Sequence, residues 1–252
     1  MLWFVATAPE LEHTQRMPAS NAPSTARERA RVEITQEILD TARGHLAKDG
    51  AASLSLRAVA RDLGMVSSAI YRYVPNRDSL LTMLIIEAYN SLGADVEKVG
   101  RTLRRDAYLE RFLVTCHAVR GWALAHPQEY ALIYGSPVPG YAAPTDTIGP
   151  ASRVPTVLLT ILIDMHRNDR PKKSMPVEPL VSTAIADIRK FSGGLLPDDL
   201  LLRGMAAWSG LFGAVSFELY GHLHNVVAEG PKHRKAYFDH QMRQVAAGLG
   251  LG

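Results

Sequence analysis

Apolar residues recur at steps of three and four positions along most of this chain. The first such run lies between Arg29 and Gly50, and its apolar positions are Ile34, Ile38, Leu39, Ala42 and Leu46. This spacing places the apolar side chains on one face of a helix, and a glycine after the last turn is a common helix end. The pattern therefore predicts a helix from about residue 29 to residue 49.

Two short helices are predicted next, joined by a tight turn. The first covers 56–63, with Ser55 as its N-cap and Gly64 as its end. The second covers 67–74, with Ser67 as its N-cap and apolar residues facing inward. Serine is a favoured N-cap, and glycine tolerates the left-handed conformation that ends many helices.

The remainder of the chain also has helical periodicity wherever it is regular. The predicted helices cover residues 77–99, 105–125, 155–165, 179–189, 198–227 and 233–249. Proline and glycine gather at 135–155 and 171–179, which predicts two loops. No stretch alternates as a strand does, so we expect an all-α fold.

The pattern also predicts the domain organisation. Residues 1–26 are rich in proline and serine without periodicity and are expected to form a flexible N-terminal arm. Residues 27–88 would then form a three-helix domain, and 89–252 a larger helical domain. The longest apolar stretch, 154–163, is about half of what a bilayer crossing needs, so we expect no membrane partner.

Composition and charge exclude some classes of protein but do not identify the function. Apolar residues make up 47% of the chain, which excludes disorder of the whole chain. The formal net charge of +3 permits contact with an acidic polymer but does not demand it. The single cysteine, Cys116, cannot form an internal disulfide, and the start of the chain lacks the basic residue and length of a signal peptide. We therefore expect a cytoplasmic protein.

Enzymatic and metal chemistry find little support in the sequence. The chain contains no GxSxG, HExxH or glycine-rich phosphate loop, and we expect neither catalytic residues nor a cofactor. Cys116 and His117 would diverge by about 100 degrees on a helix, which separates a nucleophile from its base. His222 and His224 point to different sides and lack an accompanying ligand cluster, so no metal site is expected.

The two short helices and the turn at Gly64 form a helix-turn-helix arrangement. The second helix of such a motif buries one side and offers the other to the DNA major groove. Ser68, Tyr71 and Arg72 share one face, at positions i, i+3 and i+4, and side chains of this kind can reach base edges or phosphates. Ser55 and Ser67, at helix N-termini, can help to hold a phosphate.

Each of these residues also has a structural interpretation. The serines can be helix caps alone, Tyr71 and Tyr73 half-buried aromatics, and Arg72 a solvated charge. The clustering of arginines in 27–78 favours the DNA interpretation, because local charge matters more than the total. The candidate DNA-binding residues are Ser55, Arg57, Ser67, Ser68, Tyr71, Arg72, Tyr73 and Arg77.

The run from Leu54 to Leu81 resembles the DNA-binding signature of the TetR family of transcriptional regulators. It contains the hydroxyl residue that opens the second helix, the Ala-x-x-Leu-Gly turn, the recognition-helix tyrosine and a basic residue with leucines at the fourth helix. The resemblance implies phosphate contacts for Tyr71 and Arg77. The chain departs from the family pattern at two places: Tyr73-Val74 stands where an aromatic pair such as His-Phe is frequent, and Arg77 stands where lysine is frequent.

The larger domain has apolar bulk that could line a small-molecule cavity. The candidates are Phe112, Cys116, Trp122, Tyr130, Tyr134, Met165, Met205 and Trp208. The alternative is that these side chains simply fill the core, as helical spacing usually implies. The family resemblance implies that a ligand in such a cavity lowers the affinity of the protein for its operator.

The segment 206–219 is apolar nearly all round and predicts a subunit interface. Two helices of each subunit would pack on their twofold mates, with Phe212, Val215, Leu219, Phe238, Met242 and Val245 at the interface. The segment resembles the C-terminal domain of a TetR subset named for a Trp-His-Gly motif, with Phe212 in place of the histidine. We expect a homodimeric repressor that binds palindromic double-stranded operator DNA and is released by a small apolar effector. The alternative is a helical small-molecule-binding protein with weak or no DNA binding.

Overall fold

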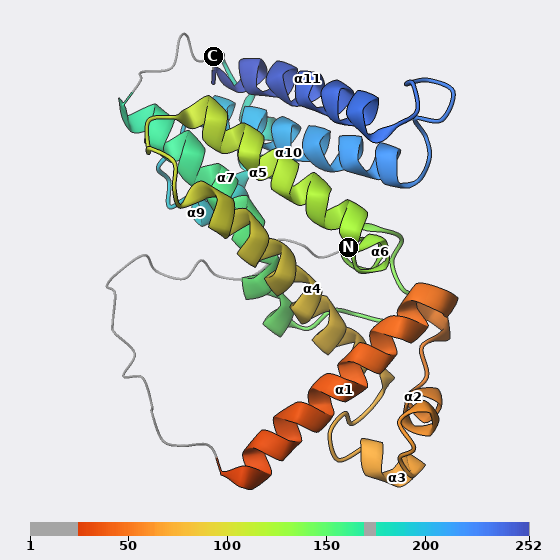
Figure 1. The fold of residues 1–252 in the computed structure, drawn as a ribbon. Coiled ribbons are helices and arrows are strands. Elements are labelled where there is room, and N and C mark those ends of the chain that lie inside the picture. The colour runs from red at the N-terminus through yellow and green to blue at the C-terminus, as the bar shows by residue number, and fades with distance from the viewer. Residues whose placement is uncertain (1–24, 169–174, 252) are drawn as a thin grey trace. The chain divides into compact units, whose positions relative to one another are not determined.

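The computed structural model describes residues 25–168 and 175–251, and its regular elements in these ranges are helices (Figure 1). The expected all-α fold is confirmed. The predicted N-terminal arm falls mainly on residues outside the described ranges. The helices are α1 (Ala26–Asp49), α2 (Leu56–Asp62), α3 (Ser67–Ile70), α4 (Arg77–Gly100), α5 (Tyr108–Ala125), α6 (Pro127–Tyr134), α7 (Ile148–Asn168), α8 (Pro179–Ala184), α9 (Ala186–Phe191), α10 (Asp198–Leu219) and α11 (Pro231–Leu249), with short 3-10 helices at Ala51–Ser53 and Thr145–Thr147.

Several helix boundaries differ from the periodicity prediction. Helix α6 was not predicted, and the helix expected over 179–189 divides into α8 and α9. Helix α7 begins before Pro155 and continues through it. Val154 is buried in the turn that precedes the proline, and this packing outweighs the hydrogen bond that a proline removes from a helix.

The chain forms two compact units, each composed of segments that are distant in sequence. Among the described residues, the first unit contains 25–89 and 128–147, and the second contains 90–127 and 148–251. Helix α4 begins in the first unit and ends in the second. This division differs from the expected 27–88 and 89–252 because α6 and the loop after it belong to the first unit.

The first unit is built around one apolar core. Ile38 and Ala42 of α1, Val59 of α2 and Ile70 of α3 have no exposed surface, and Leu80 of α4 lies among them. Burying one valine, leucine or isoleucine side chain of this set contributes roughly 1.5–3 kcal/mol to stability. Residues 128–147 add Leu132, Val138 and Tyr141 at the edge of this core.

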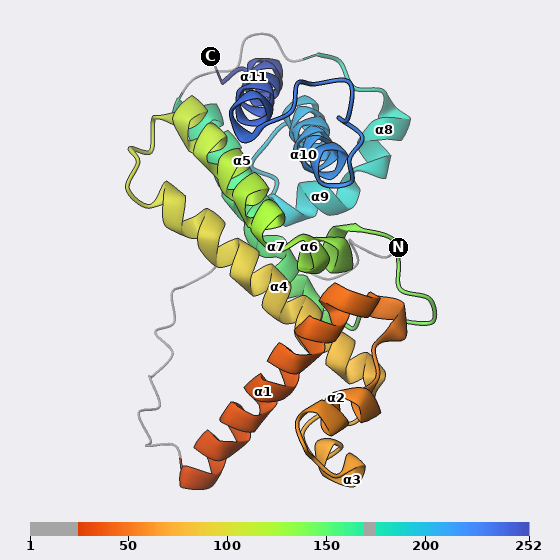
Figure 2. The same cartoon turned by 45° about the vertical axis from the view of Figure 1, so that its right-hand side comes forward.

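The second unit is a helical bundle in which α5, α7, α10 and α11 pack on one another (Figure 2). Ion pairs of low exposure join its helices. Arg120 of α5 donates to both carboxylate oxygens of Glu218 on α10, at 2.6 and 2.5 Å. Arg111 of α5 donates to the carboxylate of Asp164 on α7 at 2.8 Å. Each pair satisfies a charge that would be costly to leave unpaired away from water.

Two helical segments of the described residues are long and apolar enough to meet the length and composition of a membrane span. They are Thr145–Asn168 and Asp198–Leu219, each with a mean hydropathy of 1.3. Each also carries a buried acidic residue, Asp164 and Asp199, that is ion-paired within the unit. Only 28% and 33% of the two apolar windows is buried within the chain, so packing inside one subunit accounts for part of their apolar character.

The turn after α2 generates a stability prediction. Gly64 has a φ of 65°, a conformation that costs other residues roughly 1–2 kcal/mol. Gly64→Ala is expected to lower the free energy of unfolding by about that amount, measured by urea denaturation. Gly44→Ala is the control, because Gly44 lies within α1 with open space around it and alanine there should add about 0.5–1 kcal/mol. Equal effects of the two substitutions would contradict the left-handed conformation assigned to Gly64.

Candidate nucleic-acid interface

Helix α1 is the support on which the candidate DNA-binding segment is built. Its N-terminus is held by a capping box in which Thr25 and Glu28 bind each other's backbone N–H groups. Its buried face packs on α2, and the His45 ring lies 2.7 Å from the carboxylate of Asp62 at the end of α2. The first two helices are therefore fixed against each other by both apolar and polar contacts.

The Gly64 turn positions the next helix against this support. The Met65 N–H donates to the Ala60 carbonyl at 2.8 Å, which satisfies a carbonyl at the end of α2. Helix α3 then buries Ile70 completely, and Val74 is also fully buried after it. The predicted helix-turn-helix is thus present in the structure.

Helix α3 is shorter than the predicted 67–74. It ends at Ile70, and a turn continues to Tyr73, whose N–H donates to the Ile70 carbonyl at 2.9 Å. The predicted N-caps also need correction. Val66 is the N-cap of α3, because it holds the extended conformation while Ser67 is already helical. Ser55 occupies the N-cap position of α2, but its side chain makes no capping hydrogen bond.

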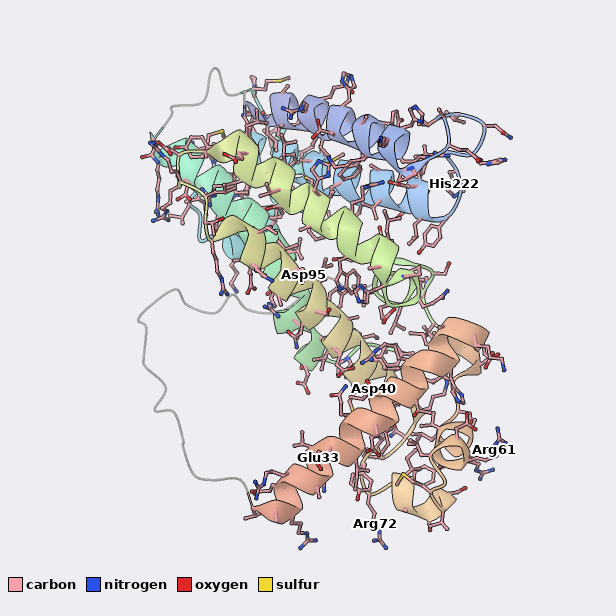
Figure 3. All side chains as sticks on the ribbon, in the orientation of Figure 1. Glu33, Asp40, Arg61, Arg72, Asp95 and His222 are labelled. Carbon is pink, nitrogen blue, oxygen red and sulfur yellow. The ribbon has the colours of Figure 1, made fainter. Side chains whose placement is uncertain are left out.

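The outer side of this segment is open to solvent. Ser67, Ser68 and Arg72 are exposed, and 43% of Tyr71 is exposed. Figure 3 shows Arg72 directed away from the core. Arg57 is exposed on α2. A short helix with a buried apolar side and a polar, cationic outer side has the two faces that major-groove docking requires.

The side chains of Tyr73 and Arg31 make contacts within the first unit. Tyr73 is half-buried at the edge of the core, and the Arg31 guanidinium of α1 lies 5.9 Å from the centre of its ring. Arg31 also donates to the Arg72 carbonyl at 3.3 Å. These contacts join α1 to the end of the exposed segment, so the side chain of Arg31 orients that segment from within the unit.

Arg77, the predicted phosphate contact of the fourth helix, holds the turn between α1 and α2. Its guanidinium donates to the carbonyls of Ala51, Ala52 and Leu54 at 2.9, 3.2 and 3.2 Å. These bonds occupy Nε and one terminal nitrogen, and the other terminal nitrogen lies 3.8 Å from the carboxylate of Asp78. The phosphate contact of Arg77 stays a prediction, and the structural contact is an addition that sequence reasoning missed.

The N-cap of α4 is a second feature that sequence reasoning missed. The Asn76 side chain accepts hydrogen bonds from the Ser79 N–H at 2.7 Å and from the Ser79 hydroxyl at 2.9 Å. Asparagine is a favoured N-cap, so its place directly before the helix was a usable signal. This cap fixes the first turn of α4 and with it the position of Arg77.

The eight candidate ligand-pocket residues do not form one lined cavity in the described residues. Tyr130 and Tyr134 belong to the first unit, and the other six, Phe112, Cys116, Trp122, Met165, Met205 and Trp208, belong to the second. Five of the eight are buried in close packing: Phe112, Cys116, Trp122, Tyr130 and Met165. Burial raises the pKa of the Cys116 thiol, so this sulfur is a packed apolar group rather than a nucleophile.

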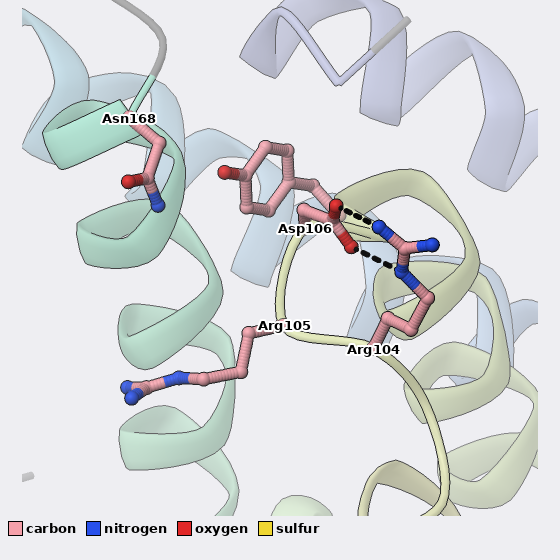
Figure 4. A pocket seen from close by; sticks show the side chains of 5 residues that line it. Arg104, Arg105, Asp106 and Asn168 are labelled. Carbon is pink, nitrogen blue, oxygen red and sulfur yellow. Dashed lines mark hydrogen bonds and ion pairs between the residues drawn. The ribbon is translucent and has the colours of Figure 1, made fainter.

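The second unit has two surface cavities that are lined by residues other than the predicted ones. One, of about 720 Å³, is lined by Arg104, Arg105, Asp106, Tyr108 and Asn168 (Figure 4). The other, of about 750 Å³, lies between α5 and α11 and includes His117, Lys235 and Asp239. Several of the charges in their walls are paired, as in the Arg104–Asp106 contact at 2.6 Å. Neither cavity is lined by any of the eight residues that we predicted.

The predicted dimer interface also needs correction. Phe212, Val215, Phe238 and Met242 are buried within the chain, where they pack α10 against α11. Leu219 and Val245 are half-buried. The four buried side chains are part of the core of one subunit, so they are not available as a surface for a partner. Phe217, one turn from Gly213 on α10, is instead 55% exposed.

Both parts of the chain match models of known families. Residues 38–84 match the family described as "Bacterial regulatory proteins, tetR family". Residues 112–245 match the family described as "Tetracyclin repressor-like, C-terminal domain". The first match covers α2, α3 and the residues that pack them, and the second covers most of the helical bundle.

Individual proteins give the same result. HTH-type transcriptional regulators of Mycobacterium bovis and Mycobacterium tuberculosis are each 40% identical to the chain over 195 residues, which is 76% of this chain and 83% of each relative. The crystal structure of SCO4313, described as a regulatory protein, is 30% identical with a TM-score of 0.72, and the match covers 88% of this chain and all of that one.

The bonds of Arg77 generate the prediction of this subsection. Arg77→Ala is expected to lower the free energy of unfolding by about 1–3 kcal/mol, because three carbonyls lose a charged donor. Arg77→Lys is expected to recover less than half of the loss, because an ammonium cannot reproduce the forked geometry. Urea denaturation of the two variants measures this. A lysine variant as stable as the original protein would show that Arg77 supplies only a charge.

Proposed function

The chain belongs to the TetR family of transcriptional regulators, and on this premise we propose that it is a homodimeric repressor that binds a palindromic operator and is released by a small apolar ligand. The family is a class of DNA-binding regulators with a helix-turn-helix domain and not a class of enzymes. The site of action would be the cytoplasm, where bacterial operator DNA lies.

The observation that supports operator binding is the exposed segment of the helix-turn-helix. Ser68, Tyr71 and Arg72 lie on the solvent side of a segment whose other side is anchored by Ile70 and Val74. Arginine can pair with guanine in the major groove, a tyrosine ring can contact a thymine methyl, and hydroxyl groups bind phosphate or base edges. A rigidly anchored set of this kind suits sequence-specific reading.

The support for a dimer comes from the outer face of α10. Ala206, Ser209, Gly213 and Phe217 follow one another at steps of three and four, and all lie outside the core of the subunit. Small residues let a second helix approach closely, and Phe217 adds apolar area to bury. A twofold dimer presents two reading segments in inverted orientation, and a palindromic operator matches that symmetry.

The support for ligand release comes from α6, which belongs to the first unit although it connects two helices of the second. Tyr89 of α4 donates its hydroxyl to the Ile133 carbonyl at 3.2 Å, and burial raises the pKa of this hydroxyl, keeping it a neutral donor. Arg43 of α1 donates to Glu87 at 2.8 Å and lies 3.7 Å from Glu129. A ligand that moves α5 or α7 would therefore act on the reading head through α6.

The proposed ligand site lies among α5, α7 and α10, which pack on one another. Phe112 and Cys116 of α5, Met165 of α7, and Met205 and Trp208 of α10 supply apolar and polarisable side chains. Methionine adapts its shape easily, so an apolar ligand could enter by displacing these side chains. Release then requires that the ligand bind the DNA-free conformation more tightly.

The test is a mobility shift of the purified protein on DNA fragments from around its own gene, across a salt series. A specific shift that weakens steeply with salt is the expected result. Tyr71→Ala is expected to weaken specific binding about 5- to 150-fold while helicity remains unchanged, from a loss of about 1–3 kcal/mol per specific contact. Unchanged affinity of Tyr71→Ala would contradict the assigned reading face.

A mobility-shift experiment in which no DNA fragment is bound would favour the alternative function. If no fragment shifts at any salt concentration after removal of co-purified small molecules, the protein is the helical small-molecule-binding protein that the sequence left open as an alternative. Mass spectrometry of the purified protein then identifies its ligand.

The dimer has a test of its own. Phe217→Glu is expected to yield monomers in light scattering at micromolar concentration, because it buries a charge at the proposed interface. Val99→Glu is the matched control, because Val99 is 36% exposed on α4 and lies away from α10 in sequence. A Phe217→Glu protein that remains dimeric would overturn the interface on α10.

A further inference from the structure

The first turns of α1 form a helix that touches little of the protein. Residues 25–33 are all exposed, and the first half-buried position of α1 is Ile34. A helical segment of this length is marginal in water without packing. The capping box at Thr25 and Glu28 nevertheless starts the helix there, with hydrogen bonds of 2.7 and 3.2 Å. A capped helix that extends beyond its own core presents a surface to something outside the unit.

The extension lies beside the segment that faces DNA. The side chain of Arg31 reaches the Arg72 carbonyl and the Tyr73 ring, at the end of that segment. Figures 1 and 2 both show the start of α1 and helix α3 at the same end of the first unit. The first turns of α1, residues 25–33, therefore lie next to the exposed face of the segment that reads DNA.

The net positive charge of the extension lies on one side of the helix. Arg27 precedes Arg31 by four residues and so lies one turn earlier on the same side of α1. Arg27 is exposed and has no partner among the described residues. The nearby carboxylate of Glu28 accepts a hydrogen bond from the Thr25 N–H, so it is engaged at the start of the helix and not with Arg27. Arg29 and Glu33 lie on the opposite side of the helix, two residues before and after Arg31.

We propose that the first turns of α1 form a second DNA contact, in which Arg27 binds a backbone phosphate flanking the base pairs that α3 reads. This inference rests on the proposed function, since it requires the same DNA complex. An unpaired guanidinium matches a phosphate in charge and in geometry. Phosphates follow one another closely along a duplex, so a partner lies within reach of a helix beside the groove.

Arg31 has a different role in this arrangement. Its guanidinium is held by the Arg72 carbonyl and the Tyr73 ring, so it is a positioning residue that fixes the extension against the reading segment. The contact also fixes the register of Arg27 relative to α3, which makes the flanking phosphate a defined position on the DNA.

The experiment compares Arg27→Ala with Arg29→Ala on one operator fragment. The two variants lose the same charge from the same exposed part of α1, and differ only in the side of the helix. A homodimer on its operator carries two copies of Arg27, so Arg27→Ala is expected to reduce the slope of log affinity against log salt by about 1.8, at about 0.9 for each phosphate contact on duplex DNA. Its affinity would then fall about twelvefold less than that of the original protein between 50 and 200 mM salt. Arg29→Ala is expected to keep the original slope.

A second measurement places the contact on the DNA. Shortening the fragment from its ends, one base pair at a time, should weaken binding of the original protein and of Arg29→Ala at one defined length, while Arg27→Ala should not respond there. Equal slopes and equal length dependence for the two variants would overturn the second contact. Absence of binding by the original protein would instead contradict the proposed function, so the two failures are distinguishable.

Discussion

The reading face of the first unit depends on the complete burial of Ile70 and Val74. Both side chains lie on the inner side of a segment that has only one regular helical turn, too short to be stable alone. Their burial against α1, α2 and α4 holds this segment in place, and the outer positions at Ser68, Tyr71 and Arg72 take their directions from it. Gly64 allows the approach because its left-handed conformation reverses the chain within one residue.

The arginines around this segment divide into two groups with different functions. Arg31 and Arg77 donate to backbone carbonyls within the unit, while Arg27, Arg57 and Arg72 direct their guanidinium groups to solvent. A carbonyl at the end of a short helix or turn needs a donor, and arginine supplies several from one planar group. Counting cationic residues near a DNA-binding motif therefore overstates the number available for phosphates.

Helix α6 gives the proposed regulation its physical basis. It is a short segment whose neighbours in sequence belong to the second unit, and whose own contacts with Tyr89 and Arg43 belong to the first. The same segment carries Tyr130 and Tyr134, which therefore belong to the first unit. They form an aromatic group with Tyr89: the ring centre of Tyr134 lies 5.2 Å from that of Tyr130 and 6.0 Å from that of Tyr89.

The sequence by itself determined the features that rest on local periodicity and on residue chemistry. The helical class, the motif around Gly64, and the inward direction of Ile70 and Val74 follow from spacing, because helix geometry fixes which positions share a face. The N-cap Asn76 and the short helix α6 carried local signals that were missed, since Pro127 and Glu129 suit the start of a helix.

Only the tertiary structure decided which face of each apolar helix belongs to the core. Phe212 and Phe238 were as suitable for an interface as Phe217 by composition, and the packing of α10 on α11 buries the first two and leaves the third exposed. The guanidinium of Arg77 finds carbonyls that lie more than twenty residues away in sequence. Periodicity reports the side of a helix on which a residue lies, whereas a partner from a distant segment is fixed only when the chain has folded.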